Sequence, residues 1–329
     1  MRLQHVSVIR ALRKGYITSG LRAAMPHSVK TAIRNRWLPV ARTIAYPVSS
    51  PRLPRPPLPR DRTPMRLGRA LMACDLNPDY LEYWPSVRRA WTEIVGVEPL
   101  LVLIADDDRV PADLRADPLV IPFAPLPHVH TALQAQCIRL LYPAILDIED
   151  AVIISDVDLF PLRRSYFVAP LERLDHRLFV SYRDVRLERK EVAIAFNAAT
   201  PSTWAELFDV SDLAGVRLRL AEWTSEVEYD GRRAWPGWYR DQEILYDTLM
   251  RWPDAPNRWW AFDDDYTRYR RLDKLELERE DGLEPHRRKG LREGSYSDYV
   301  CMFPYGEHRE VNDLVLRLAL DAADDRSAR

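Results

Sequence analysis

The chain has 329 residues, 47% of them hydrophobic, and a formal net charge of −1, so it can bury one large or two modest cores. Its three cysteines lie far apart and form no Cys-x-x-Cys pair, which excludes a disulfide framework or zinc site and favours a reducing compartment. There is no run of about 18 apolar residues, so we expect no membrane-spanning helix. The N-terminal residues lack a continuous apolar segment, so we expect no secretory signal and a cytoplasmic protein.

The charge is distributed unevenly. Residues 1–60 contain 12 Lys or Arg and no Asp or Glu, which leaves 36 basic (48 less 12) and 49 acidic residues, a net charge of −13, in the remainder. Apolar residues recur between the arginines of residues 1–50 at helical spacing, which predicts a basic amphipathic arm. This arm is suited either to lie on an anionic membrane, at the inner face of the cell membrane, or to form a poorly ordered tail.

A proline-rich segment follows the arm. Residues 51–64, PRLPRPPLPRDRTP, contain six prolines and predict an extended, semi-rigid linker. The segment separates the basic arm from an acidic body, which we expect to form one domain over residues 65–329.

Strand and helix patterns alternate from Met65 onward. They predict strands over 69–77, 99–108 and 151–158, helices over 80–95 and from 131 to about Tyr142, and a strand followed by a helix across 191–208. Such alternation predicts an α/β fold with a mainly parallel sheet, in which ligands bind beyond the carboxyl ends of the strands. Asp75, Asp106 and Asp156 fall at such ends. No glycine-rich phosphate loop is present.

Two aspartates directly follow the apolar strand in AVIISDVDLF, residues 151–160. Asp-x-Asp also occurs at 106–108 and 263–265, so the spacing alone proves little. Only Asp156 and Asp158 have apolar segments on both sides, and carboxylates held in this way suit Mg²⁺ or Mn²⁺. The alternative is a solvated loop. Tryptophans are frequent between Trp235 and Trp260, where most are expected to pack in the core and an exposed one would suit a sugar ring.

The run TALQAQCIRLLYPAILDIEDAVIISDVDLFPL resembles glycosyltransferases of GT-A fold, especially the family of glycogenin and the lipopolysaccharide galactosyltransferases. Matching features follow in the same order along residues 70–250. They are Asp75, Asn77 and Tyr80 in the opening strand, Arg139, Pro143, Asp156 with Asp158, FNAA at 196–199, and Asp241 with Gln242.

This resemblance implies a mixed, mainly parallel GT-A sheet and the transfer of a hexose from a nucleotide-diphospho-sugar, with a UDP-sugar favoured, to a hydroxyl acceptor. A glycan or lipid-linked acceptor of the cell envelope would fit the basic arm. Asp156 and Asp158 would bind Mn²⁺ or Mg²⁺. The donor would contact Asp75, Asn77, Tyr80, Asp106 and Arg139, and the sugar would contact Asn197, Asp241 and Gln242. The resemblance implies retention of configuration, but Asp241 also suits a general base for inversion or a helix cap.

The sequence departs from the family pattern at two places. Ala199 replaces the glycine of FNAG, and the closing HxxGxxKPW motif is missing. By position, His308 is the best substitute for the third metal ligand, and Arg309 for the lysine that binds the diphosphate.

Two other classes of protein remain as alternatives. A haloacid-dehalogenase-type phosphohydrolase also places Asp-x-Asp after a strand, although Phe160 stands where Thr or Val is expected. A non-enzymatic protein could use residues 1–60 to bind membranes or nucleic acid. We expect no nucleic-acid partner, because the acidic body would repel a polyanion.

Overall fold

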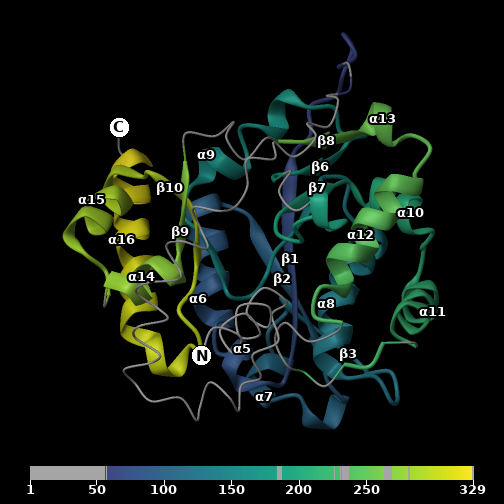
Figure 1. Ribbon diagram of the computed structural model, residues 1–329, viewed down its shortest axis with the longest axis horizontal. Coiled ribbons are helices and arrows are strands. Elements are labelled where there is room, and N and C mark those ends of the chain that lie inside the picture. Colours follow the sequence, from purple (N-terminus) through teal and green to yellow (C-terminus); the bar gives the residue numbers. More distant parts are fainter. Residues whose placement is uncertain are drawn as a thin grey trace, which may run out of the picture. The chain divides into compact units, whose positions relative to one another are not determined.

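The computed structural model describes residues 56, 58–183, 187–225, 227–229, 231, 237–262, 269–280 and 282–327 (Figure 1). These residues all belong to one compact unit, Ser50–Arg329. The predicted arm over residues 1–50, and with it the predicted amphipathic helices, lies outside the described residues. So does Asp263/Asp265, the third Asp-x-Asp pair. Among the described residues, no helix is long and apolar enough to cross a membrane.

A seven-stranded sheet forms the centre of the unit, in the order β3-β2-β1-β4-β7-β6-β8. Neighbouring strands are parallel in the β1–β2, β1–β4, β2–β3 and β6–β8 pairs and antiparallel where β7 meets β4 and β6. The predicted α/β class with a mixed, mainly parallel sheet is therefore confirmed. The strands are β1 (Leu67–Asp75), β2 (Glu98–Ile104), β3 (Val120–Phe123), β4 (Ala151–Ile154), β6 (Phe179–Ser181), β7 (Asn197–Ala199) and β8 (Trp259–Ala261).

Helices connect and cover these strands. The α-helices are α5 (Pro78–Leu81), α6 (Trp84–Arg89), α7 (Ala112–Arg115), α8 (Thr131–Leu141), α9 (Arg164–Phe167), α10 (Pro201–Phe208), α11 (Leu213–Thr224), α12 (Arg240–Arg251), α13 (Ala255–Arg258), α14 (Lys274–Glu280), α15 (Pro285–Glu293) and α16 (Arg309–Ser327). A π-helix, η1 (Ala90–Val95), continues α6, and short 3₁₀ turns lie at Asp107–Arg109, Tyr142–Ile145, Leu171–Arg173, Leu187–Arg189 and Gly306–His308.

Both faces of the central sheet are buried, as expected for parallel strands. Along β1, Ala70 and Met72 belong to one buried apolar cluster, whereas Leu71 and Ala73 belong to a second. The helices α8, α10, α11 and α12 lie on one side of the sheet and α6 lies on the other (Figure 1). Because successive side chains of a strand point to opposite faces of the sheet, they pack into two separate cores. The polar residues at the strand ends lie at the edge of the sheet.

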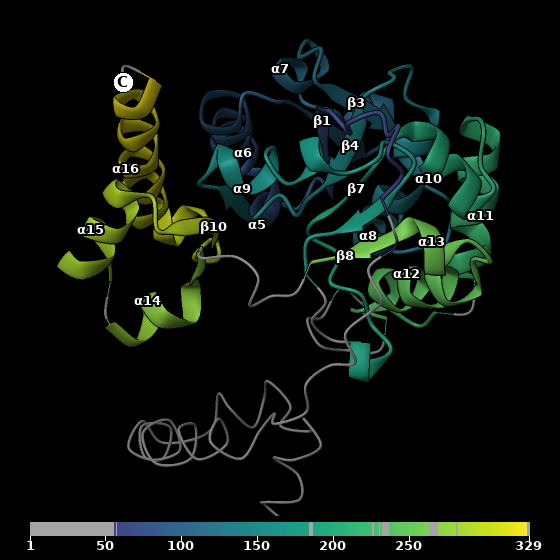
Figure 2. The ribbon, with the colours of Figure 1, turned by 90° about the horizontal axis from the view of Figure 1, so that it is seen from above.

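A smaller sheet of three strands, in the order β5-β10-β9, continues from the Asp-x-Asp turn. β5 (Leu159–Pro161) begins directly after Asp158 and pairs antiparallel with β10 (Tyr296–Val300), which pairs parallel with β9 (Arg270–Asp273). Figure 2 shows α14, α15 and α16 grouped beside β10. The amide of Cys301 donates to the carbonyl of Asp158 at 3.0 Å. The turn is therefore held by a sheet on each side.

Asp298 provides the buried charge of the small sheet. Its side chain is 0% exposed and pairs with Arg271 at 2.5 Å and Arg183 at 3.4 Å, while the Ser297 hydroxyl donates to it at 2.5 Å. Burial alone would raise the pKa of this carboxyl group, but the two guanidinium groups and the hydroxyl outweigh burial, so the pKa of Asp298 is lowered.

We expect Asp298→Asn to lower the free energy of unfolding by about 3 kcal/mol at pH 7, because two guanidinium groups lose their buried counter-charge. An unfolded Asp has a pKa of about 3.9. The pKa of Asp298 in the folded protein is lower than this unfolded value. The stabilisation that the ionised Asp298 gives to the fold is therefore complete above the unfolded pKa and is lost as the pH falls through the folded pKa. Urea unfolding at pH 7 and at a series of acid pH values measures both effects. Asp321→Asn, on the exposed surface of α16, is the matched control. Equal losses in the two variants would contradict the assignment.

Candidate active site

A cavity of about 320 Å³ lies at the carboxyl ends of β1 and β4. The structure brings most of the predicted site residues to it, namely Asp75, Asn77, Tyr80, Arg139, Asp156, Asp158, Asp241 and Gln242. They come from segments far apart in the sequence. The cavity therefore brings together two of the three polar strand ends that the alternation of strands and helices predicts to meet, those of β1 and β4.

Arg139 is the central cation of the cavity. It lies in the last turn of α8 with only 6% of its side chain exposed. Its guanidinium group donates to the Asp156 carboxylate, to the Ser155 carbonyl at 3.2 Å and to Asp241 at 2.9 Å. One side chain thus links α8, the segment after β4, and the first turn of α12.

Asp241 is fixed on two sides. One carboxylate oxygen accepts from Arg139 and the other accepts from the backbone amide of Gln242 at 2.8 Å. Burial raises the pKa of Asp241 to about 6; Arg139 and the Gln242 amide oppose this rise and Asp156 adds to it. Asp241 therefore lines the cavity as a buried, hydrogen-bonded group in the first turn of α12, whose N-cap residue is Tyr239.

Asp156 and Asp158 face the cavity with 31% and 21% of their side chains exposed. One oxygen of Asp156 is bound by Arg139, and an oxygen of Asp158 lies 4.0 Å from Lys274 Nζ. Burial raises the pKa of Asp158, and the negative charge of Asp156 raises it further. Two partly exposed carboxylates suit Mg²⁺ or Mn²⁺, which commonly bind one or two protein carboxylates together with phosphate oxygens. Among the described residues, no group of three or more His, Cys, Asp or Glu side chains could hold a metal ion.

Four other predicted residues do not line the cavity. Asp106 is exposed and begins a 3₁₀ turn after β2. The Asn197 side chain is buried and donates to the carbonyls of Ala193 and Ile194 at 2.8 and 2.7 Å, so it braces the loop before β7. His308 ends a 3₁₀ turn before α16, and Arg309 pairs with Glu82 at 3.6 Å. Position in the sequence was the only ground for predicting His308 and Arg309 as ligands of a metal and a diphosphate.

Ala199, the departure from the glycine of the family pattern, is fully buried in β7 and pairs with Val152 of β4. It does not line the cavity either. The predicted departures and substitutes, Ala199, His308 and Arg309, therefore contribute nothing to the lining of this cavity.

Lys274 is the cation that the sequence analysis missed. It begins α14, is 7% exposed, and lines the cavity beside Asp158 and 5.8 Å from the Phe303 ring. Its context, LDKLELERE, reads as an ordinary charged helix and carries no motif. Arg271 also lines the cavity.

Aromatic side chains line part of the cavity, and one of them comes from the tryptophan-rich segment of the sequence. Trp238 lines the cavity near Tyr229, with ring centroids 6.4 Å apart, while Trp252 and Trp259 are buried in the core. Tyr229 also contacts His130 edge to face at 5.3 Å. One tryptophan of the segment is thus placed where a sugar could contact it.

Comparison with protein families and with characterised proteins found no match. Comparison with solved structures found a galactosyltransferase, LgtC, in complex with donor and acceptor sugar analogs, at 16% identity and a TM-score of 0.39, covering 78% of this chain and 95% of that chain. The glycosyltransferase GlyE of Streptococcus pneumoniae is similar at 13% identity and 0.41, covering 80% and 64%. A mannosyltransferase of Pyrobaculum calidifontis, in complex with GDP-Man and Mn²⁺, is similar at 15% and 0.35, covering 82% and 79%. Each of these three proteins is a glycosyltransferase.

We expect Arg139→Gln to lower the free energy of unfolding by about 3 kcal/mol, because Asp241 would remain buried without its counter-charge. The double variant Arg139→Gln/Asp241→Asn should recover about 1 kcal/mol of that loss, since the two residues are directly coupled. Urea unfolding at pH 7 measures both values. The control is Arg251→Gln, whose side chain is 79% exposed and whose effect should stay within about 0.5 kcal/mol. Strictly additive losses in the double variant would show that the pair is not coupled.

Proposed function

We propose that this protein is a GT-A glycosyltransferase that transfers a hexose from a nucleotide-diphospho-sugar, with a UDP-sugar favoured, to a hydroxyl group of a glycan or lipid-linked acceptor. The observation that carries the proposal is the pair Asp156 and Asp158, which share one cavity at the carboxyl edge of a parallel sheet with the cations Arg139 and Lys274. Such an edge is where open α/β sheets bind their ligands.

The nucleoside would bind at the end of β1. Asp75 is held there by the Thr131 hydroxyl at 2.6 Å and by the Asn77 amide at 3.0 Å, so its carboxylate is already oriented. Tyr80 and Phe303 stand beside it with ring centroids 5.0 Å apart. Carboxylate and amide groups recognise base and ribose, and the aromatic rings supply apolar contact.

The diphosphate would bind beside Asp158. Asp156 and Asp158 are the residues that would hold Mn²⁺ or Mg²⁺, which as a Lewis acid neutralises the charge of a departing diphosphate. Lys274 adds a fixed positive charge at the same place, and Arg271 adds a guanidinium group on the same wall. These side chains stabilise the charge that develops when the bond between the sugar and the diphosphate breaks.

The sugar would lie between Trp238 and the pair Asp241 and Gln242. Both oxygens of Asp241 already accept hydrogen bonds, from Arg139 and from the Gln242 amide. This arrangement favours a role in holding the sugar over a role as the base that deprotonates the acceptor. It therefore supports the proposal of retention of configuration.

The basic arm would bring the enzyme to its acceptor. The nine Lys and Arg residues of the arm, residues 1–50, would attract an anionic membrane surface at about 1 kcal/mol for each basic residue near the lipid, and the acidic body would not. We therefore propose a peripheral location at the inner face of the cell membrane and an acceptor of the cell envelope.

We expect UDP to bind more tightly with Mn²⁺ than without it, and Asp158→Asn to abolish this difference. The variant should also keep less than a tenth of wild-type turnover with a screened UDP-sugar, a loss of more than about 1.4 kcal/mol of barrier stabilisation. Titration calorimetry and product release measure the two effects. Asp108→Asn, in the exposed Asp-x-Asp pair after β2, is the matched control and should change neither.

The outcomes separate the rival classes. Hydrolysis of a phosphate monoester without nucleotide binding would favour the phosphohydrolase. If neither binding nor turnover is detected with UDP, GDP and their sugars in the presence of Mn²⁺, the transferase proposal is wrong and a non-enzymatic binding protein is favoured.

We expect the full-length protein to co-sediment with vesicles of phosphatidylserine and phosphatidylcholine at low salt and to detach at high salt, because the attraction is screened. A shortened protein that begins at Pro51 should stay in the supernatant. It retains Thr63 and Pro64, which bond to His176 and bridge to Asp175, so the body is left intact. Equal behaviour of the two proteins would remove the membrane role of the arm.

A further inference from the structure

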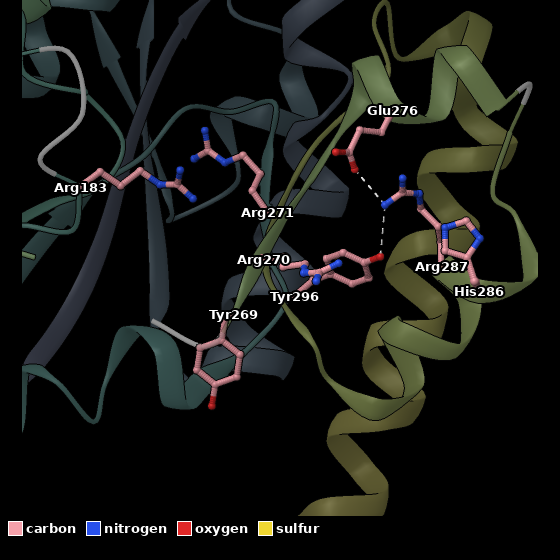
Figure 3. A pocket seen from close by; sticks show the side chains of 8 residues that line it. All are labelled: Arg183, Tyr269, Arg270, Arg271, Glu276, His286, Arg287 and Tyr296. Atoms are coloured by element: carbon pink, nitrogen blue, oxygen red, sulfur yellow. Dashed lines mark hydrogen bonds and ion pairs between the residues drawn. The ribbon is translucent and has the colours of Figure 1, made fainter. Parts of the chain in front are cut away.

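A second cavity, of about 420 Å³, lies between the small sheet and helices α14 and α15 (Figure 3). Four arginines line it: Arg183, Arg270, Arg271 and Arg287. Among the residues that the structure describes, its one acidic lining residue is Glu276. This lining is strongly basic, although the chain beyond residue 60 carries a net charge of −13.

Two acids among the described residues pair with arginines of this cavity. Asp298, buried beneath the cavity, pairs with Arg183 and Arg271, and Glu276 pairs with Arg287 at 2.8 Å. Three of the four guanidinium groups are thus paired with two carboxylates, and the fourth arginine, Arg270, is exposed. In Figure 3 the guanidinium groups of Arg183 and Arg271 point towards each other. These two acids hold Arg183, Arg271 and Arg287 in place at the cavity.

One nitrogen of the cavity wall lacks a hydrogen-bond acceptor. Arg271 donates through Nε to Asp298, but its Nη2 atom is buried and has no partner in the described part of the chain. A buried unsatisfied donor is costly and calls for a ligand or water to complete it. An oxyanion is the ligand that a guanidinium fork matches best.

The second cavity adjoins the candidate active site. Arg271 lines both cavities, and α14 contributes Lys274 to the first and Glu276 to the second. Of the side chains proposed to hold the donor diphosphate, Asp156, Asp158 and Lys274 line the first cavity alone and Arg271 lines both, whereas Arg270 and Arg287 line the second cavity alone. The second therefore offers a place for an anion that is separate from the donor.

We propose that this second cavity binds an anionic substituent, a phosphate, sulfate or carboxylate group, on the acceptor saccharide. The acceptor would thus be an acidic glycan. This inference rests on the proposed function. An anionic group held by Arg270 and Arg287 would place the adjoining sugar near the wall that Arg271 shares with the donor cavity. Tyr296, whose hydroxyl group accepts from Arg287 at 3.4 Å, would provide an additional polar contact.

The test measures the binding of galactose 6-phosphate, glucuronate and galactose to the full-length protein by calorimetry at low salt. The acidic sugars should bind at least tenfold more tightly than galactose, and inorganic phosphate should compete with them. Arg270→Gln and Arg287→Gln should each weaken galactose 6-phosphate at least tenfold. The two arginines line only the second cavity, so their loss should leave UDP binding with Mn²⁺ within twofold of wild type.

Arg292→Gln is the matched control. Arg292 lies on α15 like Arg287 but is exposed and lines neither cavity, so its variant should bind galactose 6-phosphate as the wild type does. Arg270 is exposed, so Arg270→Gln keeps the test valid if Arg287→Gln fails to fold. Equal binding of galactose and its phosphate, or no loss in Arg270→Gln, would overturn the inference. Failure of UDP to bind would instead overturn the proposed function, because the sugar titrations contain no nucleotide.

Discussion

The buried contact of Arg139 with Asp156 and Asp241 is the constraint on which the candidate active site depends. The buried guanidinium group of Arg139 needs carboxylate groups to compensate its charge, and the buried Asp241 needs the guanidinium group for the same reason. Because the three residues come from α8, the segment after β4, and α12, their charges fix the mutual position of three elements that pack around one edge of the sheet. The cavity is therefore shaped by electrostatic pairing as well as by apolar packing.

The fold could be predicted in outline because its signal is local. Apolar runs that end in acids mark parallel strands, and parallel strands bring Asp75, Asp156 and the end of α8 to one edge. The same reasoning could not place Asp106, because it specifies where a strand ends and says nothing of the loop that follows. His308 and Lys274 show the remaining limit. Neither chain order nor a motif tells which late segment folds back against Asp158, and the structure brings Lys274 there.

The small sheet serves both cavities. Its first strand follows Asp158 and its last strand in sequence, β10, carries Asp298, so the turn near the proposed donor site and the arginines of the second cavity share one support. Arg271 lies on β9, which pairs with β10, and it lines both cavities. The guanidinium group of Arg271 thus lies at both proposed anion sites. It is held there by its ion pair with the buried Asp298 of β10.

The first cavity combines residues from both ends of the domain: Asp75 closes the first strand, whereas Lys274 and Phe303 belong to its last quarter. During synthesis the N-terminal part of a polypeptide leaves the ribosome first, and domains generally fold as units. The residues of β1, β2 and β4 are therefore made long before Lys274 and Phe303, which complete the wall of this cavity. A polypeptide released between these two points lacks the groups that complete the cavity.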